Sequence, residues 1–165
     1  MTSSRQVFSP VAGTVRPLSE ASDPVFAAEM VGGGVLVVPD EQPQVTLCPA
    51  GGTLAKVHPH AFALTTNDGL GLLVHLGIDT VKLKGEPFEV LCPSSGSVTR
   101  GQQMIAWNPA DVTARQLSPE VLVCAMEAPA GSITSEAVGQ HVEAGDLLFT
   151  IPDEVQPRQR KSRKA

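Results

Sequence analysis

The sequence predicts an all-β protein, an antiparallel β-sandwich or barrel with only short helices. Glycine and proline are plentiful, at 15 and 14 residues, and they are spread along the whole chain. The apolar runs between them have the length of strands rather than of helices. A Pro-x-x-Gly-(Thr/Ser)-(Val/Leu) motif also recurs, beginning at Pro10, Pro49 and Pro93. Proline presets a turn and glycine frees the backbone, so the motif is typical of the repeated corners of such folds.

One domain is expected over residues 7–152, because a chain of 165 residues suits a single domain with its own core. Residues 1–6 are predicted to be a tail, and residues 153–165 a basic, disordered one. Strands are expected, in chain order, at the short apolar runs 35–38, 45–47, 72–76, 121–124 and 147–151.

Helix signals are weak and local. Asn108 is an N-cap candidate, and Pro109 suits the first position of a helix. These residues predict one short helix that reaches about Leu117. A further turn or two of helix is expected within residues 24–30.

Charge and cysteine content exclude several classes of function. The formal net charge is −5, although five cations stand in the last eight residues, so the rest of the chain is strongly acidic. An acidic body disfavours nucleic acid and favours a basic protein partner. The three cysteines are far apart and predict neither a disulfide framework nor a thiolate zinc site. With no apolar leader and no run near the ~20 residues that span a bilayer, the sequence predicts a cytoplasmic protein that reaches membranes only through its partners.

His60 and His75 stand in a predicted β-hairpin around an Asn-Asp-Gly turn. If residues 67–68 form a two-residue turn, His60 faces His75 and Phe62 faces Leu73. Two adjacent imidazolium ions would repel each other, so at least one ring is expected to be neutral at neutral pH. A neutral imidazole is a nucleophile, and its neighbour can orient it or stabilise charge on a transferring group. A purely structural histidine pair is the alternative interpretation.

Two residues that follow His75 are further candidates. Gly77 allows a ligand to approach the backbone closely. Asp79 can accept a hydrogen bond from an imidazole or pair with a cation on a partner. A simple turn or cap formed by Asp79 and Thr80 is the alternative.

Residues 74–88 read V-H-L-G-I-D-T-V-K-L-K-G-E-P-F, which closely resembles the active-site signature of the glucose-type enzyme IIA domain of bacterial sugar phosphotransferase systems. His60, fifteen residues before His75, is similar to the first conserved histidine of that family. Residues 9–13 and 23–32 resemble the opening segments of the domain. The likeness therefore covers nearly the whole domain, in the right order and spacing.

The resemblance implies a phosphoryl relay on a duplicated-hybrid-motif-like β-sandwich, with no required cofactor and no metal. The phosphocarrier protein HPr would deliver a phosphoryl group to Nε2 of His75. The chain would then pass the group to a cysteine of an enzyme IIB component of a membrane permease for sugars of the glucose or N-acetylglucosamine type. His60 would stabilise the group in the onward step, and Asp79 would help to engage HPr.

Two proteins would have to dock over the histidines and exclude water, so a shallow apolar surface is expected there. Phe62, Leu73 and Val81 are candidates for its rim, with core packing an equal interpretation of each. The chain departs from the family at two positions. His58 stands where many members have threonine, and Gly33 stands where enteric members carry an acid that meets HPr.

A zinc-dependent hydrolase is the main alternative function. His58 and His60 would lie on one face of a strand, and His75 would be a third ligand beside an open coordination position. The absence of an export signal and the Gly-Ile-Asp-Thr-Val string argue against it, while adventitious zinc between His60 and His75 stays open. A third hypothesis is a regulatory module whose His75 is phosphorylated but passes nothing on. The sequence names neither the sugar nor the cognate enzyme IIB.

Overall fold

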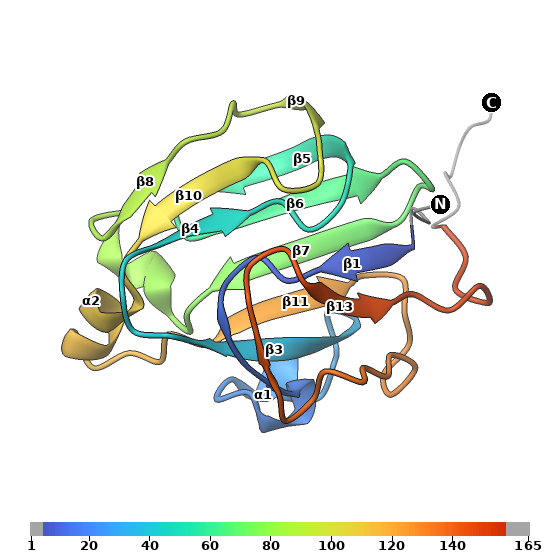
Figure 1. The fold of residues 1–165 in the computed structure, drawn as a ribbon, viewed down its shortest axis with the longest axis horizontal. Coiled ribbons are helices and arrows are strands. Elements are labelled where there is room, and N and C mark those ends of the chain that lie inside the picture. Colours follow the sequence, from blue (N-terminus) through green and yellow to red (C-terminus); the bar gives the residue numbers. More distant parts are fainter. Residues whose placement is uncertain (1–4, 158–165) are drawn as a thin grey trace.

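A computed structural model describes residues 5–157, and antiparallel sheets make up most of its regular structure (Figure 1). Within these residues the largest sheet has eight strands in the order β12-β2-β3-β11-β7-β6-β5-β9. The all-β prediction is therefore confirmed. In sheet order the strands are β12 (His141–Val142), β2 (Gly13–Pro17), β3 (Gly33–Pro39), β11 (Val121–Ala125), β7 (Gly71–Leu76), β6 (Ala61–Thr66), β5 (Gly52–His58) and β9 (Gly96–Val98).

Two smaller antiparallel sheets complete the sandwich. One has the order β4-β10-β8 and the other pairs β1 with β13. Both contribute side chains to the same core as the large sheet. Their strands are β4 (Gln44–Leu47), β10 (Gln103–Trp107), β8 (Phe88–Val90), β1 (Gln6–Phe8) and β13 (Leu147–Thr150).

The helices are short, as expected. They are α1 (Pro24–Ala27), α2 (Pro109–Ala114) and the 3-10 turns η1 (Leu18–Glu20) and η2 (Thr80–Leu83). The side chain of Asn108 caps α2 by accepting a hydrogen bond from the amide of Ala110 at 3.0 Å. Helix α2 ends before the predicted Leu117, because Gln116 adopts the left-handed conformation, with φ 66°. No helix among residues 5–157 is long and apolar enough to cross a membrane.

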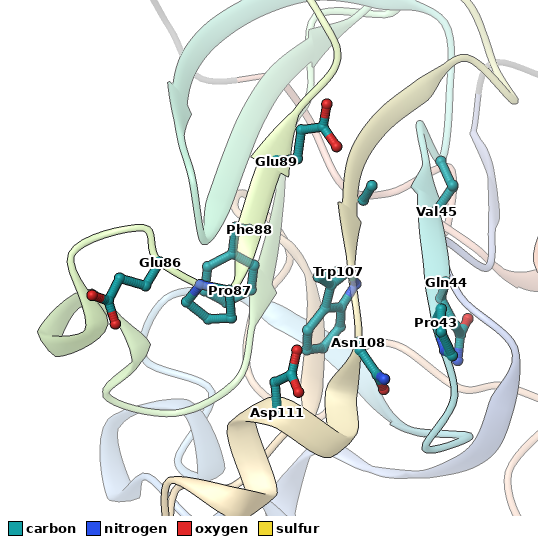
Figure 2. Close-up of a pocket in the computed structure, with 11 residues that line it drawn as sticks. Pro43, Gln44, Val45, Glu86, Pro87, Phe88, Glu89, Trp107, Asn108 and Asp111 are labelled. Atoms are coloured by element: carbon teal, nitrogen blue, oxygen red, sulfur yellow. The ribbon is translucent and has the colours of Figure 1, made fainter.

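An open pocket of about 450 Å³ lies where β4, β8 and β10 meet α2 (Figure 2). Phe88 and Trp107 form part of its wall, with ring centroids 5.6 Å apart. Glu89 and Asp111 add carboxylates. None of the residues predicted to carry the chemistry lines this pocket.

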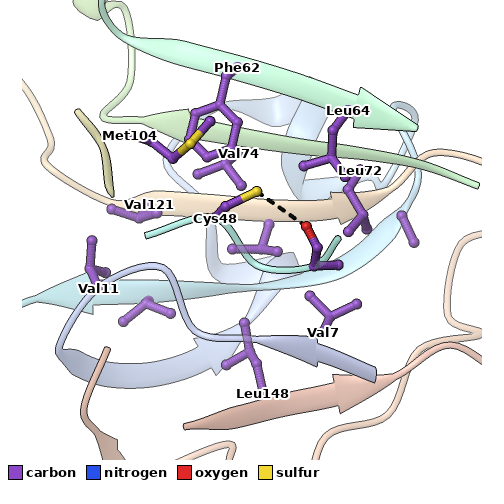
Figure 3. Close-up of a cluster of buried hydrophobic side chains, with 14 of the residues drawn as sticks. Val7, Val11, Cys48, Phe62, Leu64, Leu72, Val74, Met104, Val121 and Leu148 are labelled. Atoms are coloured by element: carbon purple, nitrogen blue, oxygen red, sulfur yellow. Dashed lines mark hydrogen bonds between the residues drawn. The ribbon is translucent and has the colours of Figure 1, made fainter. Parts of the chain in front are cut away.

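The main core fills the space between the large sheet and the two small ones (Figure 3). Phe62 and Val74 enter it from the large sheet, Met104 from β10 and Leu148 from β13. All four side chains are buried. Because β6 and β7 alternate inward and outward, their other residues lie on the opposite face of the sheet.

A second, smaller apolar cluster covers that opposite face. Leu36 of β3 and Leu122 of β11 pack there against Leu18 and Ile78. Strand β11 is therefore buried on both faces, which explains why its sequence is apolar without alternation. We call this side of the large sheet the histidine face, because His75 points to it from β7 beside Leu122.

The packed chain continues past the predicted boundary at residue 152. The guanidinium of Arg5 donates hydrogen bonds to the backbone carbonyls of Pro152 and Val155, and Val155 is only 5% exposed, within the main core. The predicted tail from residue 153 is therefore wrong at Val155, because that side chain has apolar partners to cover. The predicted basic, disordered part at 158–165 lies outside the described residues, as do residues 1–4.

Candidate active site

The hairpin that carries His75 has a register one residue away from the prediction. Ala61, rather than His60, pairs with His75. The loop holds three residues, 67–69, and Gly69 closes it in the left-handed conformation with φ 86°. The extra loop residue shifts every cross-strand pair by one, so the predicted register is wrong.

His60 still reaches His75, because it lies in the turn before β6 rather than in the strand. Its carbonyl accepts a hydrogen bond from the amide of Leu76 at 2.8 Å, which ties the turn to the end of β7. The ring centroids of His60 and His75 are 5.1 Å apart in an edge-to-face arrangement. His58, the last residue of β5, stacks on His60 with centroids 5.6 Å apart. The predicted meeting of His60 and His75 is thus confirmed, although a turn produces it.

One hydrogen bond determines which ring nitrogen of His75 carries the proton. Its Nδ1 atom lies 2.7 Å from the carbonyl oxygen of Gly77. A carbonyl oxygen only accepts, so Nδ1 carries the proton and donates it. In the neutral ring, Nε2 then keeps its lone pair and is the nucleophilic atom.

The turn at Gly77 holds that carbonyl in place. Gly77 has φ 83°, and a Cβ atom there would lie 2.4 Å from Cγ2 of Thr80. The hydroxyl of Thr80 donates to the carbonyl of Leu76 at 2.6 Å, and the amide of Gly77 donates to the backbone carbonyl of Glu120 at 2.8 Å. Thr80 fills the space into which a side chain at position 77 would project. A glycine is needed at position 77 for the turn that orients His75.

Burial favours the neutral form of both rings. Burial is the main cause that lowers the pKa of His75, while the carboxylates of Asp23 and Asp79 act in the opposite direction. The pKa of His60 is lowered to about 4, first by burial and then by the neighbouring His75 and His58. The rings of His60 and His75 are therefore both uncharged at neutral pH. Repulsion between two imidazolium ions had led us to expect this of at least one of them.

The lowered pKa of His60 predicts a loss of stability in acid. The pKa falls from an ordinary value of 6.5 to about 4 on folding, so the unfolded chain binds more protons between these values. This contribution to stability is complete above about pH 6.5 and is lost as the pH falls towards 4. The variant His60→Gln, which does not titrate, should lose less free energy of unfolding than the wild type between pH 7 and 4.5. Thermal unfolding across this range measures the difference, and equal losses would contradict the expectation.

Apolar side chains lie close to His75 on the histidine face. The ring of Phe26 in α1 lies 5.4 Å from that of His75, centroid to centroid. Beside it, Val25 is 46% exposed, and Val81 of η2 is 62% exposed. Leu73 is partly buried against the second apolar cluster. These residues supply an apolar surface of the kind that the sequence led us to expect.

The predicted place of Phe62 on this surface is wrong. Phe62 pairs with Val74, not with Leu73, and it is 1% exposed in the main core. The physical reason is the one-residue shift in register, which moves a side chain to the other face of the sheet. Core packing was the correct interpretation of Phe62.

Asp23 and Phe26 belong to the site, although the sequence did not single them out as functional residues. Asp23 caps α1, with its carboxylate accepting from the amides of Val25 at 2.8 Å and Phe26 at 3.3 Å. The same charge acts on His75. An Asp-Pro pair at a helix start is a capping signal in the sequence, but its closeness to His75 arises only in the folded chain.

The zinc alternative gains no support. Among residues 5–157, no group of three or more histidine, cysteine, aspartate or glutamate side chains is placed to hold a metal ion. His58 and His60 stack on each other, and Nδ1 of His75 is engaged with Gly77. The three predicted ligands therefore do not converge on one point.

Fold and site together define a β-sandwich protein that presents a pair of neutral histidines at its surface. Residues 5–130 match the family described as the phosphoenolpyruvate-dependent sugar phosphotransferase system, EIIA 1. The chain belongs to this family of enzyme IIA proteins, and it has a phosphotransfer role in sugar uptake. The recognition made from the sequence is confirmed.

A solved structure supports the same assignment. The glucose permease IIA from Mycoplasma capricolum superimposes with a TM-score of 0.77 at 29% sequence identity. The match covers 89% of this chain and 95% of that one. It also confirms the β-sandwich as the fold of the chain.

Proposed function

We propose that this chain accepts a phosphoryl group from phosphorylated HPr on Nε2 of His75 and passes it to a cysteine of an enzyme IIB component. The observation that carries the proposal is the hydrogen bond from Nδ1 of His75 to the carbonyl of Gly77. It leaves a neutral ring whose free lone pair lies on Nε2. Membership of the enzyme IIA family supports the choice of donor and acceptor.

In the first step, the Nε2 lone pair of His75 attacks the phosphorus carried by HPr. The phosphorus–nitrogen bond to HPr breaks as the new one forms, and its electron pair returns to the HPr imidazole. Such transfers depend on positioning and charge stabilisation more than on covalent help from the protein. A ring phosphorylated on Nε2 and protonated on Nδ1 carries positive charge. The Gly77 carbonyl and the carboxylates of Asp23 and Asp79 favour that charge.

In the second step, a thiolate of enzyme IIB attacks the same phosphorus, and the electron pair returns to Nε2 of His75. The ring centroid of His60 lies 5.1 Å from that of His75, so a ring N–H of His60 can donate a hydrogen bond to an oxygen of the moving group. The negative phosphoryl group raises the proton affinity of His60, which opposes the burial that keeps it neutral beforehand. No cofactor or metal enters either step.

Docking involves the apolar surface around the histidines. Exposed Val25 and Val81 offer area that a partner can cover, and the acidic Asp23 and Asp79 suit a basic partner. Asp79 begins η2 in the left-handed conformation, and its side chain makes no capping hydrogen bond there. Its carboxylate is thereby available to a cation of HPr. Since phosphoenolpyruvate is made in the cytoplasm, the proposal places the chain in that compartment.

A transfer assay with labelled phosphoenolpyruvate, enzyme I and HPr tests the proposal. The wild-type chain should take label and lose it when enzyme IIB is added. The variant His60→Ala should take label but pass it on about 10²-fold more slowly, the typical cost of removing one hydrogen bond to the transferring group. Label that stays on the wild-type chain in the presence of enzyme IIB would favour the regulatory module instead. No label, with HPr itself labelled, would refute the relay.

A further inference from the structure

The ring of His60 is anchored less firmly than that of His75, whose Nδ1 atom lies 2.7 Å from the carbonyl oxygen of Gly77. His60 lies in the turn between β5 and β6, so no strand ladder fixes its side chain. Within residues 5–157, neither nitrogen of its ring has a hydrogen-bond partner. Its orientation therefore depends on packing, since an imidazole without such bonds keeps its rotamer freedom unless neighbours remove it.

Two other imidazoles supply that packing. The ring of His75 meets His60 edge to face at 5.1 Å, and the ring of His58 stacks on it at 5.6 Å with 24° between the planes. Both distances fall in the 4.5–7 Å range where aromatic rings attract one another. His60 is thus held between its two histidine neighbours.

The backbone presets the stack of His58 on His60. His58 still belongs to β5, where it pairs with Ala61 of β6. Pro59 separates the two histidines, and a residue before proline is restricted to extended conformations. Proline also fixes its own φ, so few backbone arrangements are open to the segment that joins the rings.

We propose that His58 is a positioning residue: its ring holds His60 in the orientation that meets the phosphoryl group of His75 during onward transfer. The inference rests on the proposed function. His58 forms and breaks no bond in the reaction. It covers one face of the His60 ring and leaves the ring nitrogens free for the phosphoryl oxygens.

Three variants test this inference. His58→Ala removes the stacked ring, His58→Phe keeps a ring without nitrogen atoms, and His141→Ala removes another exposed histidine, which contacts Asp40 elsewhere. The measured quantity is the rate of transfer to enzyme IIB divided by the rate of labelling by HPr. His58→Ala should lower this ratio about three- to tenfold, as expected for the loss of one aromatic pair. His58→Phe should restore it to within about twofold, and His141→Ala should match the wild type.

A nuclear magnetic resonance measurement on the ring of His60 gives a second readout that needs no phosphotransfer. In His58→Ala the ring protons of His60 should lose the part of their ring-current shift that the His58 ring causes. The His60 side chain should then average over several rotamers, whereas His58→Phe should restore a single orientation. An unchanged transfer ratio in His58→Ala, or a ratio in His58→Phe as low as in His58→Ala, would overturn the inference. If the wild type takes no label, the relay itself fails, while the ring signal of His60 still decides whether His58 orients it.

Discussion

Replacing His75 with alanine is expected to abolish phosphoryl acceptance from HPr. The variant loses Nε2, the atom whose lone pair is freed by the hydrogen bond from Nδ1 to Gly77. His60 should not substitute, because its ring lacks a hydrogen bond that fixes one tautomer. The expected signal is therefore background labelling, rather than a reduced rate, in the assay with labelled phosphoenolpyruvate.

A folding defect must be separated from this chemical loss. His75 is partly buried between Phe26 and Leu122, so alanine leaves a gap on the histidine face. The variant His75→Gln fills more of the space and has no nucleophilic nitrogen, so it should also take no label. Thermal unfolding shows whether both variants fold. A folded His75→Ala chain that becomes labelled by HPr would show that another residue accepts the group.

Replacing Gly77 with alanine is expected to cost about 2–4 kcal/mol of stability. The new Cβ atom would lie 2.4 Å from Cγ2 of Thr80 and 3.0 Å from the carbonyl oxygen of Ser118. The backbone would also stay at φ 83°, which is unfavourable for any residue with a side chain. Relief of the clash has to move either Thr80 or the turn itself. Denaturant unfolding of the variant and the wild type measures the cost.

Gly101 offers a matched control for this substitution. It has φ 87°, and a Cβ atom there would meet nothing within 4 Å. Gly101→Ala should therefore show the backbone strain alone, about 1–2 kcal/mol. If Gly77→Ala costs no more than Gly101→Ala, the contact with Thr80 does not constrain the turn.

Gly77→Ala should also slow labelling by HPr. The same turn presents the carbonyl oxygen that accepts the Nδ1 proton of His75. A displaced carbonyl leaves the ring free to rotate and to exchange its tautomer, which places the lone pair on the wrong nitrogen for part of the time. Gly101→Ala should label at the wild-type rate.

The sequence allowed the fold class and the histidine pair to be predicted for physical reasons. Proline-glycine corners and short apolar runs leave an antiparallel sandwich as the natural way to bury the apolar residues. The family signature around His75 then led to the enzyme IIA assignment. These features depend on local composition and order, which a sequence displays directly.

The register of the hairpin could not be predicted in the same way. It depends on whether the loop takes two residues or three. The choice of three is stabilised by Gly69 at positive φ and by the hydroxyl of Thr66, which accepts from the amide of Leu70 at 3.1 Å. The one-residue difference in loop length decides whether Phe62 lies on the histidine face or in the core. Periodicity alone does not distinguish the two loops.

Contacts between distant segments were also out of reach. Asp23 and Phe26 approach His75 because α1 packs over the second apolar cluster. The stack of His58 on His60 requires the turn at Pro59, in a segment that would otherwise read as a continuous strand. Both arrangements follow from how the sheet is covered rather than from any local pattern.

Arg5 brings the two described ends of the chain to one place. Its Nε atom lies 2.9 Å from Asp68 at the hairpin loop, and its guanidinium also binds the carbonyl of Val155. Pro157 lies near the same loop, because a Cβ atom added to Gly69 would be 3.3 Å from the Cβ atom of Pro157. His75 stands near the far end of β7, about 15–20 Å away along a six-residue strand. A fluorophore, a solid support or a fused protein joined near Arg5 or Pro157 would therefore leave the imidazoles facing solution, which suits the chain to tethered assays of transfer one molecule at a time.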